Sequence, residues 1–352
     1  MNRSASEASS PAKPGLLGRA IASHMSRLTL EKVSTLGMRN AELNKPRIAS
    51  GKSVLALRHG RLMEGDTALA MAAGPSLHRR DVGRQLKAAA FKGTLITTES
   101  ALAYCLRHEI VPDLVVTLDP HPDRIVRWFG DPALDQGRLD QDDYFRRQDM
   151  DPNFASAQLR FNEELIRLVN TYGPKLRVAV SSSASQAVVD RVYEAGADVY
   201  WWNPFYDDYD LPNSLTRALY ESNRLPCLNA GGNVGSACWV IAHAVLEKRK
   251  VGLVGMDLSY YPDTPYEKTQ YYYELVKLVG HERLDEVFVD IYNPEVGAKF
   301  FTDPTYLWYR DSFLAMAQEG SCETYNCTEG GILFGKGVKT TTLTEFFKSI
   351  AV

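Results

Sequence analysis

Short apolar runs recur along most of the chain, and each is separated from the next by a segment long enough to form a helix. This alternation of strand-like and helix-like segments predicts an α/β fold with a doubly wound, mostly parallel sheet. A helix is predicted over 305–318, just before the last apolar run. The predicted strands lie at 67–72, 94–97, 114–118, 176–180, 199–202, 251–254 and 323–326.

The amino-terminal part of the chain departs from this alternation. Residues 1–17 are rich in Ser, Ala, Pro and Lys, and such a composition buries too little surface to fold, so we expect disorder there. Residues 18–50 are predicted to form a helical preface, whose loose apolar face includes Leu36 and Leu43. The main domain then extends over 51–352 and is interrupted at about 120–154 by an Asp- and Arg-rich insertion, expected to lie on the surface beside a ligand cleft.

Composition and charge narrow the classes of partner. The 40 basic and 43 acidic side chains give a net charge of -3, so no global positive field attracts nucleic acid. No apolar run approaches the roughly 20 residues of a membrane span, and we expect a cytoplasmic protein. The five cysteines are scattered and form no C-x-x-C pair, which is typical of reduced cysteines used in packing.

The first candidate binding element is the loop after the predicted strand 67–72. Gly74 allows a ligand to approach the backbone, Pro75 stiffens the turn, and the amide groups and hydroxyl of Ser76 can face a phosphate. The alternative is that Ser76 only caps the helix that follows.

A second glycine-rich turn at 229–236 also precedes an apolar helix. Gly232 and Gly235 permit tight backbone approach, while Asn233 and Ser236 supply donors for a sugar or phosphate. The turn has neither the lysine of a P-loop nor the spacing of a dinucleotide fingerprint. A generic anion-binding turn is the alternative.

Polar side chains at strand ends complete the candidate set. Thr98 ends one predicted strand, and Asp119 follows another, where α/β sheets present functional groups or where Asp before Pro simply forms a turn. Asp257 closes an apolar strand, which is costly unless its carboxylate meets a donor, a ligand hydroxyl or a metal. The Asp-x-Asp patterns at 140–142 and 208–210 are interpreted as solvated acidic loops, and no metal site is predicted.

Taken in order, these motifs resemble a known family. The segments 74–77, 112–120, 229–236, 254–257 and 326–331 together resemble the central domain of motility-associated (Maf-type) flagellin glycosyltransferases, over about 28–352. Some of them are also similar to motifs of single-domain bacterial sialyltransferases and of archaeal-type 6-hydroxymethylpterin pyrophosphokinases. The resemblance implies a Rossmann-like fold.

The resemblance also implies an activity: inverting transfer of an acidic sugar, nonulosonic or Kdo-like, from a CMP-sugar donor to a hydroxyl of a protein or glycan, flagellin among them. No cofactor is required in this interpretation. By the order of the sialyltransferase motifs, Tyr260 or Tyr261, together with Tyr266, would support the leaving phosphate, and His281 would be the general base. Asp257 joins this catalytic set, while a surface histidine at a helix end is the alternative for His281.

Two other functions stay open from the sequence. A pterin pyrophosphokinase would need ATP, magnesium and an acidic clamp, for which Asp113, Asp119 and Asp123 are candidates. A non-catalytic partner in a flagellar or polysaccharide system is the third possibility. Whatever the ligand, Ser76 and Asp257 are predicted to share one cleft, because a doubly wound sheet gathers the carboxyl ends of its strands along one edge.

Overall fold

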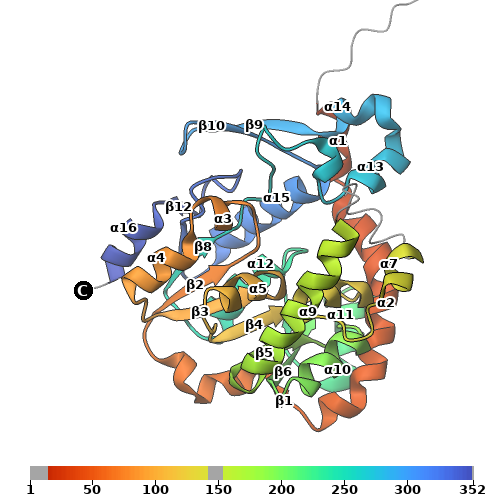
Figure 1. Cartoon of the computed structure of the whole chain (residues 1–352), viewed down its shortest axis with the longest axis vertical. Helices are drawn as coiled ribbons and strands as arrows, with labels where there is room; N and C mark the ends of the chain where they lie inside the picture. The colour runs from red at the N-terminus through yellow and green to blue at the C-terminus, as the bar shows by residue number, and fades with distance from the viewer. Residues whose placement is uncertain (1–14, 142–153, 351–352) are drawn as a thin grey trace, which may run out of the picture.

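The computed structural model describes residues 15–141 and 154–350, which are built around one ten-stranded sheet (Figure 1). Its strands are β1 (Lys52–Ser53), β2 (Thr67–Met71), β3 (Thr94–Thr98), β4 (Leu114–Thr117), β5 (Arg177–Ser181), β6 (Asp198–Pro204), β7 (Cys227–Leu228), β8 (Lys250–Val254), β11 (Glu323–Asn326) and β12 (Lys339–Thr340). They lie in the order β1-β6-β5-β4-β3-β2-β8-β11-β12, with β7 beside β6, and every pairing is parallel. The predicted fold class and all the predicted strands are confirmed.

Both faces of the sheet are covered, which explains why its central strands are apolar throughout. Every residue of β2 and β3 is buried, as expected for a parallel sheet between two helical layers. Trp201 and Trp202 are neighbours in β6, yet they belong to the cores on opposite faces. Successive side chains of a strand point to opposite faces of the sheet, so the burial of both tryptophans shows that both faces are covered.

Helices form the two covering layers. One face packs against α4 (Val82–Ala89), α5 (Glu99–Arg107), α9 (Phe154–Tyr172), α10 (Gln186–Glu194) and α16 (Leu343–Ile350). The other packs against α12 (Val234–Val240), its π-helical continuation η5 (Ile241–Val245), and α15 (Pro304–Glu319), the helix predicted over 305–318. Two further helices are α3 (Ser76–Arg79) and α11 (Leu215–Asn223). None of the described helices is long and apolar enough to cross a membrane.

A small subdomain at one end of the molecule was not predicted (Figure 1). It consists of the antiparallel hairpin β9 (Val289–Asn293) and β10 (Ala298–Thr302) with helices α13 (Tyr272–Val279) and α14 (Leu284–Val287). Its core is largely aromatic and includes Tyr260, Phe288 and Phe301. Aromatic rings thus make up more of this core than of the sheet's, together with the buried aliphatic residues Leu275, Leu284 and Val287.

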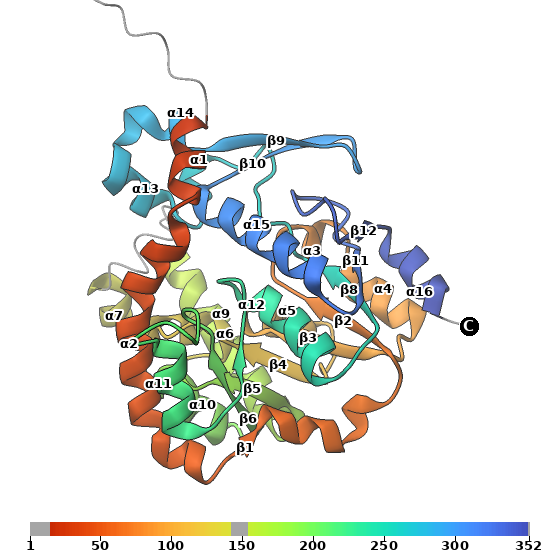
Figure 2. The same ribbon diagram turned by 180° about the vertical axis from the view of Figure 1, so that it is seen from behind.

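The amino-terminal helices run from this subdomain to the far edge of the sheet (Figure 2). They are α1 (Leu16–Ala22) and α2 (Met25–Ala49). The first helix begins one residue before the predicted limit of disorder at about residue 17, and residues 1–14 lie outside the described residues. The predicted apolar face was wrong at Leu43, which is 51% exposed, whereas Leu36 is half-buried and Asn44 is fully buried. Asn44 Nδ2 donates to the carbonyls of Ser182 (2.9 Å) and Ala184 (2.8 Å), so this helix packs by hydrogen bonds.

The described part of the predicted insertion is not a surface excursion. It forms η3 (Pro122–Arg124), α6 (Ile125–Trp128) and α7 (Gln136–Gln141). Ile125, Trp128 and Phe129 are buried in the core between the sheet and α9. The prediction failed because the many charged residues of this segment drew attention away from a short apolar stretch within it. Residues 142–153 lie outside the described part.

Replacing Asn44 by Ala should lower the free energy of unfolding by about 1–3 kcal/mol, because two buried carbonyls lose their donor. Urea unfolding followed by circular dichroism measures the change. Arg39→Ala, an exposed position on the same helix, serves as the control and should be nearly neutral. Equal stabilities of the two variants would contradict this account of α2.

Candidate functional site

The order of the strands places a switch point between β2 and β8. From β2 the chain adds β3, β4, β5 and β6 on one side, and then returns to place β8 and β11 on the other side of β2. In open α/β sheets, ligands bind at the carboxyl ends of the strands beside such a point. The loops after β2 and β8 contain Ser76 and Asp257, two of the site residues predicted from the sequence.

Ser76 and Asp257 are in direct contact at this point, so their predicted proximity is confirmed. Ser76 Oγ donates to Asp257 Oδ2 at 2.6 Å, and the Ser76 amide lies 3.2 and 3.3 Å from the two carboxylate oxygens. Burial raises the pKa of Asp257 to about 6, although the hydrogen bonds from Ser76 act in the opposite direction. The carboxylate therefore ties the loop after β2 to the end of β8.

The same contact requires glycine at position 74. A Cβ at Gly74 would lie 2.1 Å from Asp257 Oδ2 and 2.4 Å from the Gly255 carbonyl oxygen. Both donors of Ser76 are bonded to Asp257, and Ser76 is buried, whereas Pro75 is exposed. Phosphate binding by Ser76 stays a prediction, but in this conformation its donors face a carboxylate and not the cleft.

The second glycine-rich turn caps helix α12. Asn233 Oδ1 accepts from the Ser236 amide at 2.9 Å, and Asn233 Nδ2 donates to Ser236 Oγ at 2.8 Å. Gly232 is exposed, has a φ of +84°, and would bring a Cβ within 2.3 Å of the Trp308 ring. The backbone at Gly232 is thus the part of this turn open to a ligand, while Asn233 and Ser236 stabilise the helix start.

Met256 joins the two glycine-rich elements. A Cβ at Gly235 would lie 2.3 Å from Met256 Sδ, and Met256 precedes Asp257. The turn before α12 and the end of β8 are therefore packed against each other. Gly74, Ser76, Asp257 and Gly235 therefore form one continuous structural unit, of which the shared-edge argument predicted the pair Ser76 and Asp257.

The ends of β3 and β4 contribute the charged part of the site. Thr98 caps α5, accepting from the Ala101 amide at 3.2 Å, and is almost fully buried. Asp119 is half-buried; its Oδ1 accepts from the His121 amide at 2.8 Å, and its Oδ2 lies 3.7 Å from Arg124 Nε. The Asx turn expected as the alternative is therefore present, and it holds the carboxylate beside a cation.

Glu99 is a site residue that the sequence reasoning missed. It is 2% exposed, and its Oε2 has no hydrogen-bond partner among the described residues. Burial raises its pKa to about 8, with a further contribution from the charge of Asp119, while Arg124 acts in the opposite direction. A neutral carboxylic acid therefore lies beside Asp119 at physiological pH.

Tyr309 of α15 was also missed and faces these charges. Burial raises its pKa to about 12, and the fields of Asp119 and Arg124 also act on its hydroxyl. A Cβ at Gly232 would lie 2.9 Å from its ring, so Tyr309 lies between the glycine turn and the loop after β4. The other contact of its hydroxyl is Tyr271 Oη, at 3.4 Å.

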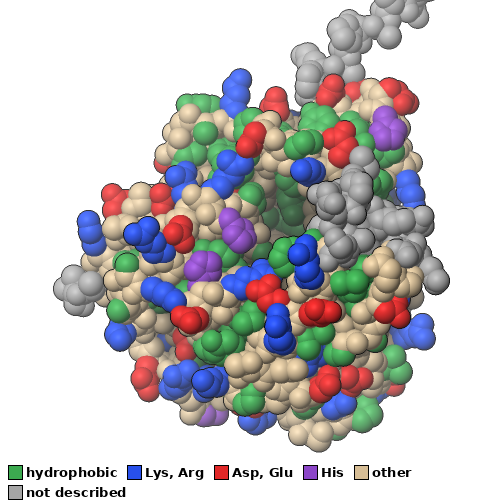
Figure 3. All heavy atoms as spheres, in the orientation of Figure 1, with side chains coloured by type: hydrophobic (Ala, Val, Ile, Leu, Met, Phe, Trp, Pro, Cys, Tyr) green, Lys and Arg blue, Asp and Glu red, His purple; other side chains and the backbone are tan. Residues whose placement is uncertain are grey.

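Gly232, Glu99, Asp119, Arg124 and Tyr309 come together at the carboxyl edge of the sheet through the contacts and charges given above, and we call this place the central cleft. Figure 3 shows a hollow near the middle of the face seen in Figure 1, with hydrophobic side chains at its bottom and charged side chains below it in the view. A strand-end carboxylate was the signal used for Asp119. The same signal, applied one residue beyond β3, would have identified Glu99.

The catalytic tyrosines and the histidine expected from the resemblance lie mostly in the subdomain. Tyr260 is buried; its hydroxyl donates to Asp303 at 2.8 Å and accepts from the Gln270 amide at 3.0 Å. His281 is exposed, and its Nδ1 lies 3.1 Å from the Tyr272 hydroxyl. The structure gives neither side chain a contact with the central cleft, and their catalytic roles stay predictions.

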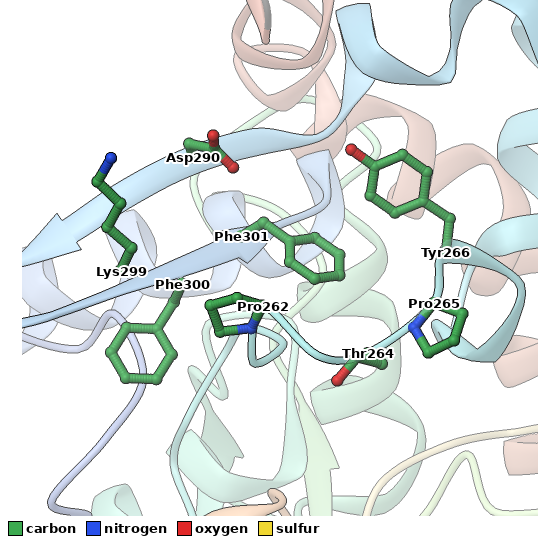
Figure 4. Close-up of a pocket in the computed structure, with 8 residues that line it drawn as sticks. All are labelled: Pro262, Thr264, Pro265, Tyr266, Asp290, Lys299, Phe300 and Phe301. Carbon is green, nitrogen blue, oxygen red and sulfur yellow. The ribbon is translucent and has the colours of Figure 1, made fainter.

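Tyr266 lines a separate groove of about 460 Å³ between the hairpin and the loop after Tyr261 (Figure 4). Its hydroxyl donates to Asp285 at 3.2 Å. The alternative Tyr261 lies closer to the switch point: its hydroxyl has no hydrogen-bond partner among the described residues, and burial, aided by the charge of Asp257, raises its pKa. Of the predicted tyrosines, Tyr261 is the one associated with Asp257.

The acidic clamp considered for a pyrophosphokinase is not assembled. Asp113 precedes β4, where it accepts from the Leu95 amide at 3.0 Å, whereas Asp119 follows the same strand. The two carboxylates thus lie at opposite edges of the sheet. Across residues 15–141 and 154–350, no group of three or more His, Cys, Asp or Glu side chains is arranged to hold a metal ion.

Comparison with known proteins gives a likeness in structure but none in sequence. No protein family model and no curated protein matches the chain. Its fold is similar to that of a Maf glycosyltransferase from Magnetospirillum magneticum AMB-1, at a TM-score of 0.47 and 17% sequence identity. The match covers 78% of this chain and 33% of that protein, so the chain spans about a third of its length.

Replacing Ser76 by Ala should lower the free energy of unfolding by about 1–3 kcal/mol, because the buried carboxylate of Asp257 loses its hydroxyl donor. Nucleotide affinity should change little, since the hydroxyl faces Asp257. Urea unfolding and ligand titration of the same variant separate the two effects, and exposed Ser321→Ala is the control. Full stability with weakened nucleotide binding would instead favour direct contact between Ser76 and phosphate.

Glu99 should make the protein less stable as the pH rises. Its folded pKa of about 8 exceeds the ordinary value of 4.5, so the folded state keeps a proton that the unfolded chain releases. The resulting stability is complete below about pH 4.5 and is lost as the pH rises through 8, by at most about 1.4 kcal/mol per pH unit. Glu99→Gln should remove this part of the pH dependence between pH 6 and 9 in urea unfolding, whereas exposed Glu163→Gln should retain it.

Proposed function

We propose that the protein is a glycosyltransferase that binds a CMP-activated acidic sugar in the central cleft and transfers the sugar, with inversion, to a hydroxyl of a protein or glycan. The observation that carries the proposal is the joint presence of Arg124, Asp119, Tyr309 and an exposed glycine turn at the carboxyl edge of the sheet. This set offers a cation, a base and a neutral donor to one ligand. The choice of CMP follows the motif order in the sequence, with flagellin among the candidate acceptors.

The donor phosphate would lie between Arg124 and the backbone of Gly232. A guanidinium forms charge-assisted hydrogen bonds to phosphate, and a glycine backbone allows close approach of the anion. The Tyr309 hydroxyl stays protonated at neutral pH, because burial raises its pKa to about 12. It can therefore donate to the phosphate oxygen that leaves the sugar.

Asp119 is our candidate for the base that accepts the proton of the attacking hydroxyl. The oxygen of the acceptor forms a bond to the anomeric carbon while the bond from that carbon to the phosphate oxygen breaks, and CMP leaves with the electron pair. A protonated Glu99, whose pKa burial raises to about 8, avoids a second negative charge near Asp119. His281 would have to approach from the subdomain to take this role.

The test is ligand-dependent thermal unfolding. CMP should raise the melting temperature, as preferential binding to the folded state requires, and ATP with magnesium should do so less. Tyr309→Phe should bind CMP nearly as well as the wild type but lose about 10²–10³-fold in turnover of a CMP-sugar, the usual effect of removing one donor to developing charge. Exposed Tyr292→Phe is the matched control.

The outcomes separate the three functions. A clear shift with ATP and magnesium and none with any cytidine nucleotide would overturn the proposal in favour of the pyrophosphokinase. Binding without any hydrolysis or transfer product from the donors would favour a non-catalytic partner. Full activity of Tyr309→Phe would reject the role given to this hydroxyl.

A further inference from the structure

A second hollow lies at the opposite edge of the sheet from the central cleft. Its volume is about 340 Å³, which is at the lower end of the range for small-molecule sites. It is formed by the amino ends of β5 and β6, by β1, and by the 3-10 helices η1 (Val54–His59) and η2 (Arg61–Met63). Its charged and polar lining comprises Lys52, His59, Arg61, Arg177, Asp198 and Tyr200.

The one carboxylate in this lining is already satisfied. Lys52 Nζ lies 2.7 Å from Asp198 Oδ1, and the Tyr200 hydroxyl donates to Asp198 Oδ2 at 2.8 Å. Burial acts to raise the pKa of Asp198, but these two partners hold it below its ordinary value. Asp198 is therefore ionised and its two oxygens are occupied.

Among the cations that line the hollow, Arg177 is the one whose charge is not paired with a carboxylate in the described structure. Lys52 is paired with Asp198, and Arg61 lies 3.1 Å from Asp113 at the rim. In the described part of the chain, the side chain of the half-buried Arg177 has neither a hydrogen bond nor an ion pair. Its field nevertheless acts on Lys52, Asp198 and Tyr200, so the guanidinium lies beside a second cation with no anion of its own.

We propose that this hollow, which we call the amino-edge site, binds a small phosphate dianion such as a phosphomonoester, with Arg177 as its principal ligand. An arginine fork matches the oxygens of phosphate, and Lys52 adds a point charge that the ligand shares with Asp198. The Tyr200 ring beneath Lys52, 5.2 Å from its ammonium, forms an apolar floor. Exposed His59 supplies a further donor at the opening.

The amino-edge site is separate from the proposed donor site. Arg177 and Asp198 are the first residues of their strands, whereas Asp119 and Arg124 follow β4 at the carboxyl edge. The strands of the sheet lie between the two sites. A ligand at the amino edge could therefore bind together with one in the central cleft, and the inference does not depend on the proposed function.

The experiment measures binding of inorganic phosphate to the full chain by thermal unfolding and calorimetry, against sodium chloride at equal ionic strength. Phosphate should raise the melting temperature of the wild type, and Arg177→Gln should weaken the affinity by about tenfold or more, as the loss of a charged hydrogen bond implies. Exposed Arg84→Gln, a matched loss of one positive charge, should bind like the wild type. Circular dichroism confirms that each variant is folded.

A cleft variant locates the phosphate. Arg124→Gln should retain the phosphate shift, because Arg124 lies at the other edge of the sheet. Loss of the shift in Arg124→Gln and its retention in Arg177→Gln would place the anion in the central cleft and overturn the proposal. No difference between phosphate and chloride in the wild type would overturn it as well. If Arg177→Gln is unstable, Arg177→Lys should fold and show intermediate affinity.

Discussion

The carboxylate of Asp257 lies where the two halves of the sheet meet, and it is only 1% exposed. A buried charge is tolerated when hydrogen bonds replace its hydration, and here Ser76 supplies them from the loop after β2. That contact excludes any side chain at position 74 and fixes the direction in which the loop leaves the strand. The turn before α12 packs on the neighbouring Met256, so the wall of the central cleft is built outward from this one pair.

The sheet could be predicted because a strand that is buried on both faces has apolar residues at consecutive positions of the sequence. Strand β2 has this pattern, whereas an amphipathic helix places polar residues between its apolar ones. The hairpin β9–β10 has a less clear hydrophobic pattern, because Tyr292 is 57% exposed and charged residues lie next to buried aromatic ones in its sequence. In α2 the usual rule fails, because Asn44 is buried to satisfy backbone carbonyls while Leu43 faces solvent.

Some residues of the candidate site could likewise be predicted from the sequence and others could not. The meeting of Ser76 and Asp257 follows from topology, because parallel strands deliver their carboxyl ends to one edge whatever the side chains are. Glu99 also directly follows a strand, but as the first residue of α5 it has the sequence pattern of an ordinary acidic helix start. Only the tertiary packing shows that it is buried. Tyr309 comes from a helix far along the chain, and nothing local indicates that it faces Asp119.

Helix α2 has 25 residues, which at about 1.5 Å per residue spans roughly 37 Å. It is preceded by α1, which lies against the subdomain: the amide of Gly15, the N-cap of α1, donates a hydrogen bond to the carbonyl of Asp285. Through Asn40 and Asn44 it is fixed to the loops after β4 and β5. Helix α2 therefore spans the distance from the subdomain to the loops at the carboxyl edge of the sheet. Its length, together with the contact between Tyr271 and Tyr309, fixes how far apart these two parts of the molecule lie.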